Sequence, residues 1–301
     1  MTKKTLVRRP ALCGGALVVV VVVVVMVRPR HDRASPPLGR CPESSRERIP
    51  RHVFYTGKVD SRLRMLTDAN GSWPADFGFS FFSDGAMRTS MKHLDAELAK
   101  TNNVTGAYDA FESLRNWALR ADLWRYAILW ACGGIYVDAK MKLTADFGAF
   151  YANALSSHDD ASLMTCADRY LTRRDAEPLP LWQGFLMAAP RSPDLAETLR
   201  LAIANVQRRS YDVRVLAITG PRAIGAAVRP GLDKGRVAIV CDQVARTETI
   251  TTPFLRLNKT VRDNPLLFVE DKALHDDVRG GTAHSYSAMY RARDLYHTAR
   301  R

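Results

Sequence analysis

The sequence predicts an α/β domain in which a mainly parallel sheet is flanked by helices, after an N-terminal transmembrane helix. Strand-like and helical patterns alternate from residue 51 onward, which is typical of strands joined by crossover helices. A long amphipathic helical stripe runs into a glycine pair and then into a short β-type run, within 109–138. An uncharged apolar run, 11–27, stands near the N-terminus.

The apolar run 11–27 predicts a transmembrane signal anchor that follows a short cytoplasmic tail, 1–10. In lipid a helix is the one single-segment structure that satisfies its own backbone hydrogen bonds. A cleaved signal peptide is the alternative, but the end of the run, Val-Met-Val-Arg-Pro at 25–29, offers no small-residue cleavage site. We therefore expect a single-pass type II membrane protein whose main domain is lumenal.

The segment 28–50 is rich in Pro, Arg and Ser and predicts a stem, which leaves 51–301 as the folded domain. Much of the formal charge of +13 belongs to Lys and Arg that flank the apolar run or lie in the stem, so the domain is only mildly basic. A nucleic-acid partner is therefore not expected.

Three sequons suit a lumenal domain: Asn70, Asn103 and Asn258. The cysteines outside the apolar run either pair as disulfides or stay as separate buried thiols: Cys41, Cys132, Cys166 and Cys241.

Hydrophobic periodicity predicts the elements of the domain. Strands are expected at 52–56, 77–83, 135–138, 162–167, 184–189 and 237–241, and helices at 87–100, 109–132 and 193–208. The helix 109–132 carries an apolar stripe at steps of three and four residues: Leu114, Trp117, Ala121, Trp124 and Ile128. Gly133 and Gly134 are expected to end it, because glycine adopts the left-handed conformation that closes a helix.

Three polar residues form the candidate site. Asp138 ends the strand that follows the glycine pair, and ligands of open α/β sheets bind beyond the carboxyl ends of strands. Asp122 and Arg125 are three residues apart on the preceding helix, so they share one face of it. Two carboxylates and one cation suit a hydroxyl-rich, phosphate-bearing ligand. The alternative for the helical pair is an ordinary surface ion pair.

The stretch Ala121 to Asp138, ADLWRYAILWACGGIYVD, resembles the pattern of glycosyltransferases with a DXD-type sugar-binding region. The group is similar to family 32 and includes yeast α-mannosyltransferases, α-1,4-galactosyltransferases and, more distantly, clostridial glucosylating toxins. Weaker likenesses to the family lie at 49–57, 184–190 and 219–221, so the resemblance extends from about residue 49 to the C-terminus.

The resemblance implies a GT-A-like nucleotide-diphospho-sugar transferase domain. The implied enzyme is a hexosyltransferase that retains anomeric configuration and moves a hexose from a GDP- or UDP-linked donor to a glycan or glycolipid in the Golgi or ER lumen. The residues implied to line the base and ribose are Phe54, Tyr55, Thr56 and Gly57. Asp122 and Arg125 are implied to hold the sugar, with Tyr136 and Asp138 completing the donor site.

The motif departs from the family at one position, because Lys140 stands where the second aspartate of DXD binds Mn²⁺. Three hypotheses follow. Lys140 itself contacts the donor diphosphate and takes part of the role of the metal. Alternatively, a divalent metal still binds through Asp138 and a downstream group: Asp146, His275 or His284. In the third, the site is inactive and the domain only binds a sugar or nucleotide.

Overall fold

The computed structural model describes Cys41 and residues 47–57, 73–143, 146–168, 180–211, 214–244, 254–256, 266–270 and 286–297. Within these ranges no helix has the length and apolar character needed to cross a membrane. The predicted tail, the signal anchor and most of the stem lie outside the described residues, as do Asn70, Asn258, His275 and His284.

The described strands form one nine-stranded sheet with the order β2-β1-β3-β6-β5-β7-β8-β9-β4. Their bounds are β1 His52–Thr56, β2 Gly78–Phe82, β3 Gly134–Val137, β4 Met141–Leu143, β5 Leu163–Ala167, β6 Leu181–Ala188, β7 Val237–Val244, β8 Phe254–Arg256 and β9 Leu266–Glu270. β1 pairs in parallel with β2 and β3, and β5 with β7, whereas the other five pairings are antiparallel.

The prediction of a mainly parallel sheet was therefore wrong, and the sheet is mixed. The physical reason is connectivity. β6 is the antiparallel neighbour of β5, which it follows along the chain, and β8 and β9 each pair antiparallel with the strand before them. Antiparallel neighbours need no crossover helix between them. The alternation of strands with helices, from which a parallel sheet was predicted, therefore holds for only part of the chain.

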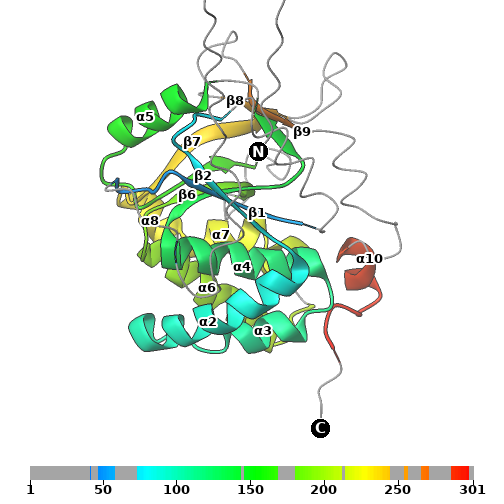
Figure 1. Cartoon of the computed structure of the whole chain (residues 1–301). Coiled ribbons are helices and arrows are strands. Elements are labelled where there is room, and N and C mark those ends of the chain that lie inside the picture. The colour runs from blue at the N-terminus through cyan, green and yellow to red at the C-terminus, as the bar shows by residue number, and fades with distance from the viewer. Residues whose placement is uncertain are drawn as a thin grey trace, which may run out of the picture. The chain divides into compact units, whose positions relative to one another are not determined.

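Helices lie on both sides of the sheet (Figure 1). Their bounds are α2 Asp84–Asn102, α3 Ala107–Ser113, α4 Trp117–Cys132, α5 Phe147–Ser157, α6 Pro193–Gln207, α7 Pro221–Ala227, α8 Arg229–Asp233 and α10 Tyr286–Arg291, with a short 3-10 turn at Val215–Ala217. α4 packs against α2 and α6 on one side of the sheet, and α5 lies on the other.

The long helix expected at 109–132 is two helices, so that prediction was also wrong. The chain leaves α3 at Ser113 and re-enters a helix at Trp117. Asn116 is the N-cap of α4, and its side-chain oxygen accepts hydrogen bonds from the N–H groups of Ala118 and Leu119, at 2.9 and 3.4 Å. The break is also held from a distance, because the N–H of Arg115 donates to the carbonyl of Leu295 at 2.7 Å.

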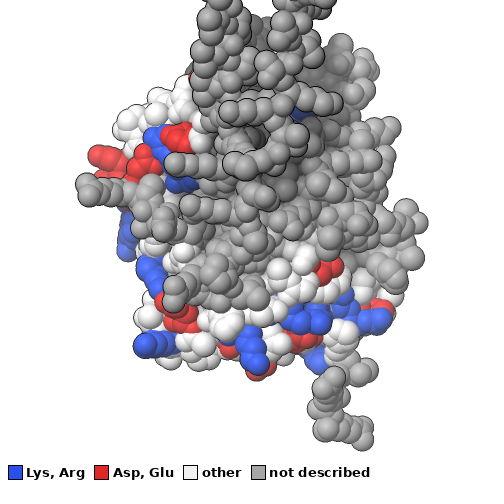
Figure 2. Space-filling model, in the orientation of Figure 1, with Lys and Arg blue, Asp and Glu red and all other residues white. Residues whose placement is uncertain are grey.

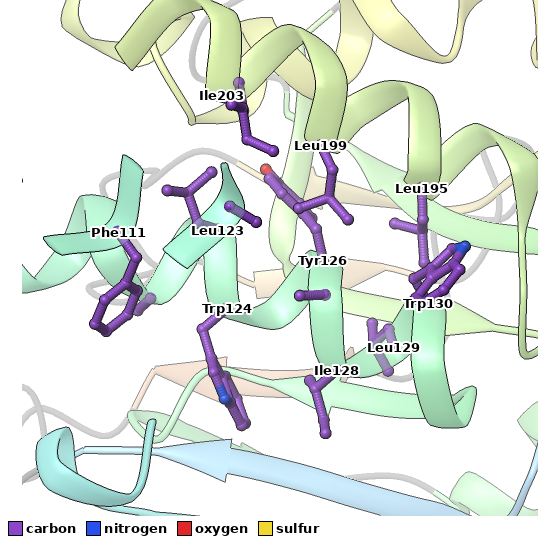
Figure 3. Packing of buried hydrophobic residues seen from close by; sticks show 14 of the residues in the cluster. Phe111, Leu123, Trp124, Tyr126, Ile128, Leu129, Trp130, Leu195, Leu199 and Ile203 are labelled. Atoms are coloured by element: carbon purple, nitrogen blue, oxygen red, sulfur yellow. The ribbon is translucent and has the colours of Figure 1, made fainter. Parts of the chain in front are cut away.

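Two apolar clusters fill the two faces of the sheet. The first joins α2, α3, α4 and α6 to the sheet, and the second lies beneath α5. Strand β1 shows the alternation that separates them, since Phe54 belongs to the first cluster and Val53 and Tyr55 to the second. Figure 3 shows how Trp124 and Trp130 of α4 extend the first cluster along the helix. α4 is thus buried almost throughout, so any charge it carries must be paired.

The glycine pair sets the direction of β3. The helix ends at this pair as the sequence predicts, and Gly133 and Gly134 both have positive φ, 64° and 95°, but Gly133, with ψ of −162°, does not have the left-handed helical conformation that was expected. A Cβ on Gly134 would lie 2.6 Å from the carbonyl oxygen of His52, so only glycine lets β3 lie against β1 here. The chain turns back at this point, and Asp138 at the far end of β3 forms an ion pair with Arg125 of α4.

Four cysteines form two disulfides, which resolves the alternative that the sequence leaves open. Cys41 pairs with Cys132 at the end of α4, and Cys166 of β5 pairs with Cys241 of β7, with Cα separations of 5.2 and 4.5 Å.

The described charged residues on the face drawn in Figure 2 are interspersed, with Lys and Arg next to Asp and Glu.

Candidate functional site

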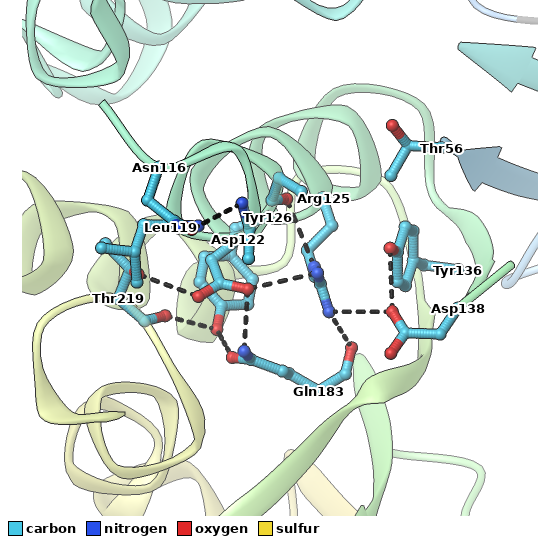
Figure 4. A network of polar contacts seen from close by, with 12 residues as sticks. Thr56, Asn116, Leu119, Asp122, Arg125, Tyr126, Tyr136, Asp138, Gln183 and Thr219 are labelled. Atoms are coloured by element: carbon cyan, nitrogen blue, oxygen red, sulfur yellow. Dashed lines mark hydrogen bonds and ion pairs between the residues drawn. The ribbon is translucent and has the colours of Figure 1, made fainter. Parts of the chain in front are cut away.

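Arg125 is the centre of a buried polar network at the carboxyl end of β3 (Figure 4). Its guanidinium lies 3.2 Å from Oδ1 of Asp122 on the same helix and 3.4 Å from Oδ1 of Asp138 beyond β3. It also donates a hydrogen bond of 2.9 Å to the backbone carbonyl of Gln183 on β6. The structure therefore brings together the three residues that the sequence places in one candidate site.

Burial makes this arrangement more than a surface ion pair. The side chains of Asp122 and Arg125 are each 7% exposed, whereas that of Asp138 is 23% exposed. Burial opposes the charge of Arg125, but the oxygens of Tyr136, Asp122 and Asp138 outweigh it and hold the pKa of Arg125 above its ordinary value. The cation is therefore permanent, and Asp138 is the member of the trio that is most open to a ligand.

Asp122 is held by hydrogen bonds on both carboxylate oxygens. The side-chain amide of Gln183 donates to Oδ1 at 2.8 Å, and the hydroxyl of Thr219 donates to Oδ2 at 2.8 Å. Burial nevertheless raises the pKa of Asp122 to about 6, although Arg125 and both hydrogen bonds act in the opposite direction. Asp122 is consequently ionised at neutral pH and becomes protonated in mildly acidic solution.

Tyr126, one residue after Arg125, fixes the two partners of Asp122. Its hydroxyl donates to the backbone carbonyl of Thr219 at 2.8 Å and is also in hydrogen-bond contact with Oε1 of Gln183. The side chain is fully buried, and burial raises the pKa of its phenol well above the ordinary value. The phenol therefore keeps its proton and remains a hydrogen-bond donor.

Tyr136 supports Asp138 and Arg125 from β3. Its hydroxyl donates to Oδ1 of Asp138 at 3.0 Å, and the guanidinium of Arg125 lies 4.4 Å from the centre of its ring. Gly184 completes the surroundings of Asp138, since its carbonyl accepts from the N–H of Asp138 at 2.8 Å. A Cβ on Gly184 would lie 2.8 Å from Oδ2 of Asp138, so a larger residue would displace the carboxylate.

Lys140 lies in a β-turn directly after Asp138. The N–H of Met141 donates to the carbonyl of Asp138 at 2.9 Å and closes the turn, with Lys140 as its third residue and half-buried. Among the residues that the structure describes, no three His, Cys, Asp or Glu side chains are placed to hold a metal ion. Asp146, a candidate metal ligand, is instead the N-cap of α5 and accepts from the N–H of Ala149 at 3.0 Å.

The residues expected to line the base and ribose lie at the carboxyl end of β1, next to β3, but most of them already have partners within the protein. Phe54 and Tyr55 are buried in the two apolar clusters on opposite faces. The hydroxyl of Thr56 donates to the sulfur of Met87 at 2.8 Å, and the N–H of Gly57 donates to the carbonyl of Phe82. Figure 4 shows Thr56 near Tyr136, at the end of β1.

Three members of the network have no role in the sequence prediction: Tyr126, Gln183 and Thr219. Tyr126 and Thr219 belong to stretches that resemble the family, but their contacts depend on the distant packing of α4 against the segment before α7. Gln183 gives a local signal, because it is the one polar side chain in the strand Leu181–Ala188. A lone polar residue in a buried strand needs a partner, and here that partner is Asp122.

One family model matches the part of the chain that carries most of this network. Residues 60–162 match the family model described as glycosyltransferase sugar-binding region containing DXD motif. The match includes Asp122, Arg125, Asp138 and Lys140, but neither β1 nor Gln183 and Thr219. No curated protein matches the sequence.

Three solved structures show partial likeness. The PaToxG glycosyltransferase is 18% identical over 62% of this chain and 72% of its own, with a TM-score of 0.43. The UDP-bound glycosyltransferase domain of the YGT toxin is 9% identical over 60% of this chain and 54% of its own, with a TM-score of 0.34, so this chain spans about half of it. Mouse xyloside xylosyltransferase 1 in its apo form is 12% identical over 62% of this chain and 83% of its own, with a TM-score of 0.33.

These TM-scores are too low to carry functional information, whereas the family match covers the helix, the turn and the strand end that build the network. The matched segment, 60–162, is thus similar to a glycosyltransferase sugar-binding region, and the match supports a transferase of this kind.

Proposed function

We propose that the protein is a retaining glycosyltransferase that moves a hexose from a GDP- or UDP-linked donor to a glycan or glycolipid acceptor. The observation that carries the proposal is the link that Arg125 forms between Asp122 and Asp138, at 3.2 and 3.4 Å, inside the segment that matches the family. Buried paired charges at the carboxyl end of a strand are more typical of a ligand site than of a stabilising contact.

The network suits the sugar and the diphosphate of such a donor. The carboxylates of Asp122 and Asp138 accept hydrogen bonds from sugar or ribose hydroxyls, and Arg125 fixes the positions of both. Lys140, in the turn after Asp138, supplies a cation on the side where a diphosphate would follow. The base and ribose are proposed to lie near Thr56 and Gly57, at the end of β1.

Transfer with retention breaks the bond between the anomeric carbon and the diphosphate oxygen, whose electron pair leaves with the diphosphate. The acceptor hydroxyl forms its bond to the same face of the anomeric carbon, and its proton passes to the departing diphosphate. Negative charge therefore develops on the diphosphate, and cations fixed in advance around it lower the barrier. Arg125, which lies 3.4 Å from Asp138, and Lys140, in the turn directly after Asp138, are the cations proposed for this role.

We further propose that the enzyme is a type II membrane protein of the Golgi or ER, with its catalytic domain in the lumen. Two disulfides support an oxidising compartment, because such bonds are rare in proteins kept in a reducing one. The apolar run 11–27, with basic residues before it, supports a signal anchor.

A screen of UDP- and GDP-sugars for hydrolysis, with and without Mn²⁺, tests the proposed activity. We expect release of nucleoside diphosphate from one donor class, and loss of at least about two orders of magnitude in rate for Asp138→Ala and Asp122→Asn. A sugar- or nucleotide-binding protein without activity is the second candidate, and Lys140 in place of an acid favours it. Donor binding without turnover in every condition would establish that candidate instead.

A further inference from the structure

We propose that Lys140 makes donor binding independent of a divalent metal ion. Lys140 stands at the motif position whose aspartate would hold the metal in a DXD-type region. Its ammonium group supplies positive charge in place of that metal. This inference rests on the proposed function, because it concerns the diphosphate of the same donor. It adds a property that neither the fold nor the family match contains.

The formal charges of the motif residues balance without a metal. Arg125 lies between the carboxylates of Asp122 and Asp138, and Lys140 adds a second cation two positions after Asp138 in the chain. An acid at position 140 would leave an excess of two negative charges, which one divalent cation neutralises. With lysine the formal charges of these four side chains add up to zero, so no excess negative charge of the side chains is left for a metal to neutralise. A diphosphate then meets cations that the side chains already supply.

Asp138 already has two partners on one of its carboxylate oxygens. Its Oδ1 already accepts from the hydroxyl of Tyr136 at 3.0 Å and lies 3.4 Å from Arg125. Metal ions of this class prefer several oxygen ligands, and among the described residues no three His, Cys, Asp or Glu side chains are grouped so that they could hold one. A dication bound to Asp138 alone would lie close to Arg125 and two residues from Lys140, where repulsion opposes it. The described donor set therefore does not fit a divalent metal.

The turn after Asp138 fixes the backbone position of Lys140. The hydrogen bond from Met141 to the carbonyl of Asp138 fixes the turn, so residue 140 starts from a backbone that both β3 and β4 hold. Met141 and Leu143 are buried on β4, whereas Lys142 between them is exposed and points to the opposite face. Lys140 and Lys142 thus carry the same charge two residues apart but belong to a turn and to a strand, which makes Lys142 a matched control.

Calorimetric titration with UDP and with GDP tests the proposal on the full chain. For the wild type we expect the same Kd within about twofold in EDTA and in Mn²⁺. Lys140→Asp should weaken binding in EDTA by at least about tenfold and recover it when Mn²⁺ is added, because the charge of a DXD site is restored. Lys140→Met should weaken binding in both conditions. Lys142→Asp should behave as the wild type.

Electron paramagnetic resonance of Mn²⁺ gives a readout that does not depend on activity. With UDP or GDP present, we expect the wild type to leave the free-ion signal at the level set by the nucleotide alone, and Lys140→Asp to capture about one ion per chain. Circular dichroism and thermal melting confirm that each variant is folded. If Lys140→Asp does not fold, Lys140→Met carries the comparison.

Two results overturn the inference separately from the proposed function. Nucleotide binding by the wild type that disappears in EDTA, or one Mn²⁺ captured per wild-type chain with nucleotide, would show a metal-dependent donor site and leave the transferase proposal intact. Absence of binding to both nucleotides, together with no hydrolysis of any donor, would refute the proposed function and the inference with it.

Discussion

Thr219 donates a hydrogen bond from its hydroxyl to Oδ2 of Asp122 at 2.8 Å, across 97 positions of the chain. Asp122 belongs to α4, whereas Thr219 stands directly before the N-terminus of α7. The candidate site is therefore held by two segments, one inside the family match and one beyond it. Its geometry depends on the segment before α7, which bonds to Asp122 and Tyr126, and on the packing of α7 against β6, and not only on the motif.

Asp122 should give donor binding a pH dependence. Its pKa is raised to about 6 by burial, so the carboxylate becomes a neutral acid as the pH falls through that value. A neutral acid is a weaker acceptor for sugar hydroxyls and a weaker partner for Arg125. We expect the Kd of a UDP- or GDP-sugar to rise below about pH 6 in titrations from pH 5 to 8. Asp122→Asn should bind more weakly and without that inflection.

The same shift should affect stability with the opposite sense. The folded protein binds the Asp122 proton more tightly than the unfolded chain does, whose Asp pKa is about 4. This tighter proton binding adds on the order of 3 kcal/mol to the free energy of unfolding below about pH 4. The added stability is lost as the pH rises to about 6, and the free energy of unfolding no longer changes with this group at higher pH. Urea unfolding of the wild type and of Asp122→Asn at pH 4.5 and 7 measures it. An equal change in both proteins would contradict the assignment.

Tyr126→Phe should damage the site without touching a proposed ligand contact. The change removes the hydroxyl proton, so the Thr219 carbonyl and Oε1 of Gln183 lose their hydrogen bond from Tyr126. We expect this loss to lower the free energy of unfolding by about 1–3 kcal/mol. Because both partners also donate to Asp122, we expect the pKa of Asp122 to rise and the inflection in donor binding to move to higher pH. Tyr108→Phe on α3, outside this network, is the control and should leave the inflection in place.

Gly134→Ala should disrupt the approach of β3 to β1. The added Cβ would lie 2.6 Å from the carbonyl of His52, at a φ of +95° that alanine rarely adopts. We expect a loss of several kcal/mol in unfolding free energy, together with weaker donor binding, because β3 carries Asp138. Gly85→Ala is the matched control. No atom lies within 4 Å of its added Cβ and the residue is in α2, so this variant should be as stable as the wild type or more so.

The disulfides predict a simple thiol count. Of the five cysteines, two pairs are bonded, so one thiol per denatured, unreduced chain should react with an alkylating agent, as mass spectrometry would show. Cys132→Ser and Cys41→Ser should each cost about 2–4 kcal/mol, and the double variant about the same as either one. Additive losses would show that the two cysteines are not bonded to each other.

The sequence predicts the site better than the sheet. Asp122, Arg125 and Asp138 lie within one helix-turn-strand unit, so local spacing places them together. The parallel sheet failed as a prediction because the position of β6 between β3 and β5 depends on pairing over long separations, for which no local pattern exists.

The break between α3 and α4 has the same cause. The apolar stripe continues through Leu114, which is fully buried in the structure, so periodicity alone gives no reason for the helix to stop. The stop comes from Asn116 as an N-cap and from Leu295, far along the chain, which accepts a hydrogen bond from Arg115. Gln183 likewise acquires its role only when β6 lies next to β3.

The bond between Cys41 and Cys132 has a practical consequence for making the domain as a secreted protein. Cys41 lies before the first strand, in a segment that sequence alone assigns to the stem. A truncation that begins at Glu47 would retain every strand and helix that the structure describes but leave Cys132 with an unpaired thiol at the end of α4. A recombinant form should therefore begin before Cys41 and be expressed through a secretory pathway.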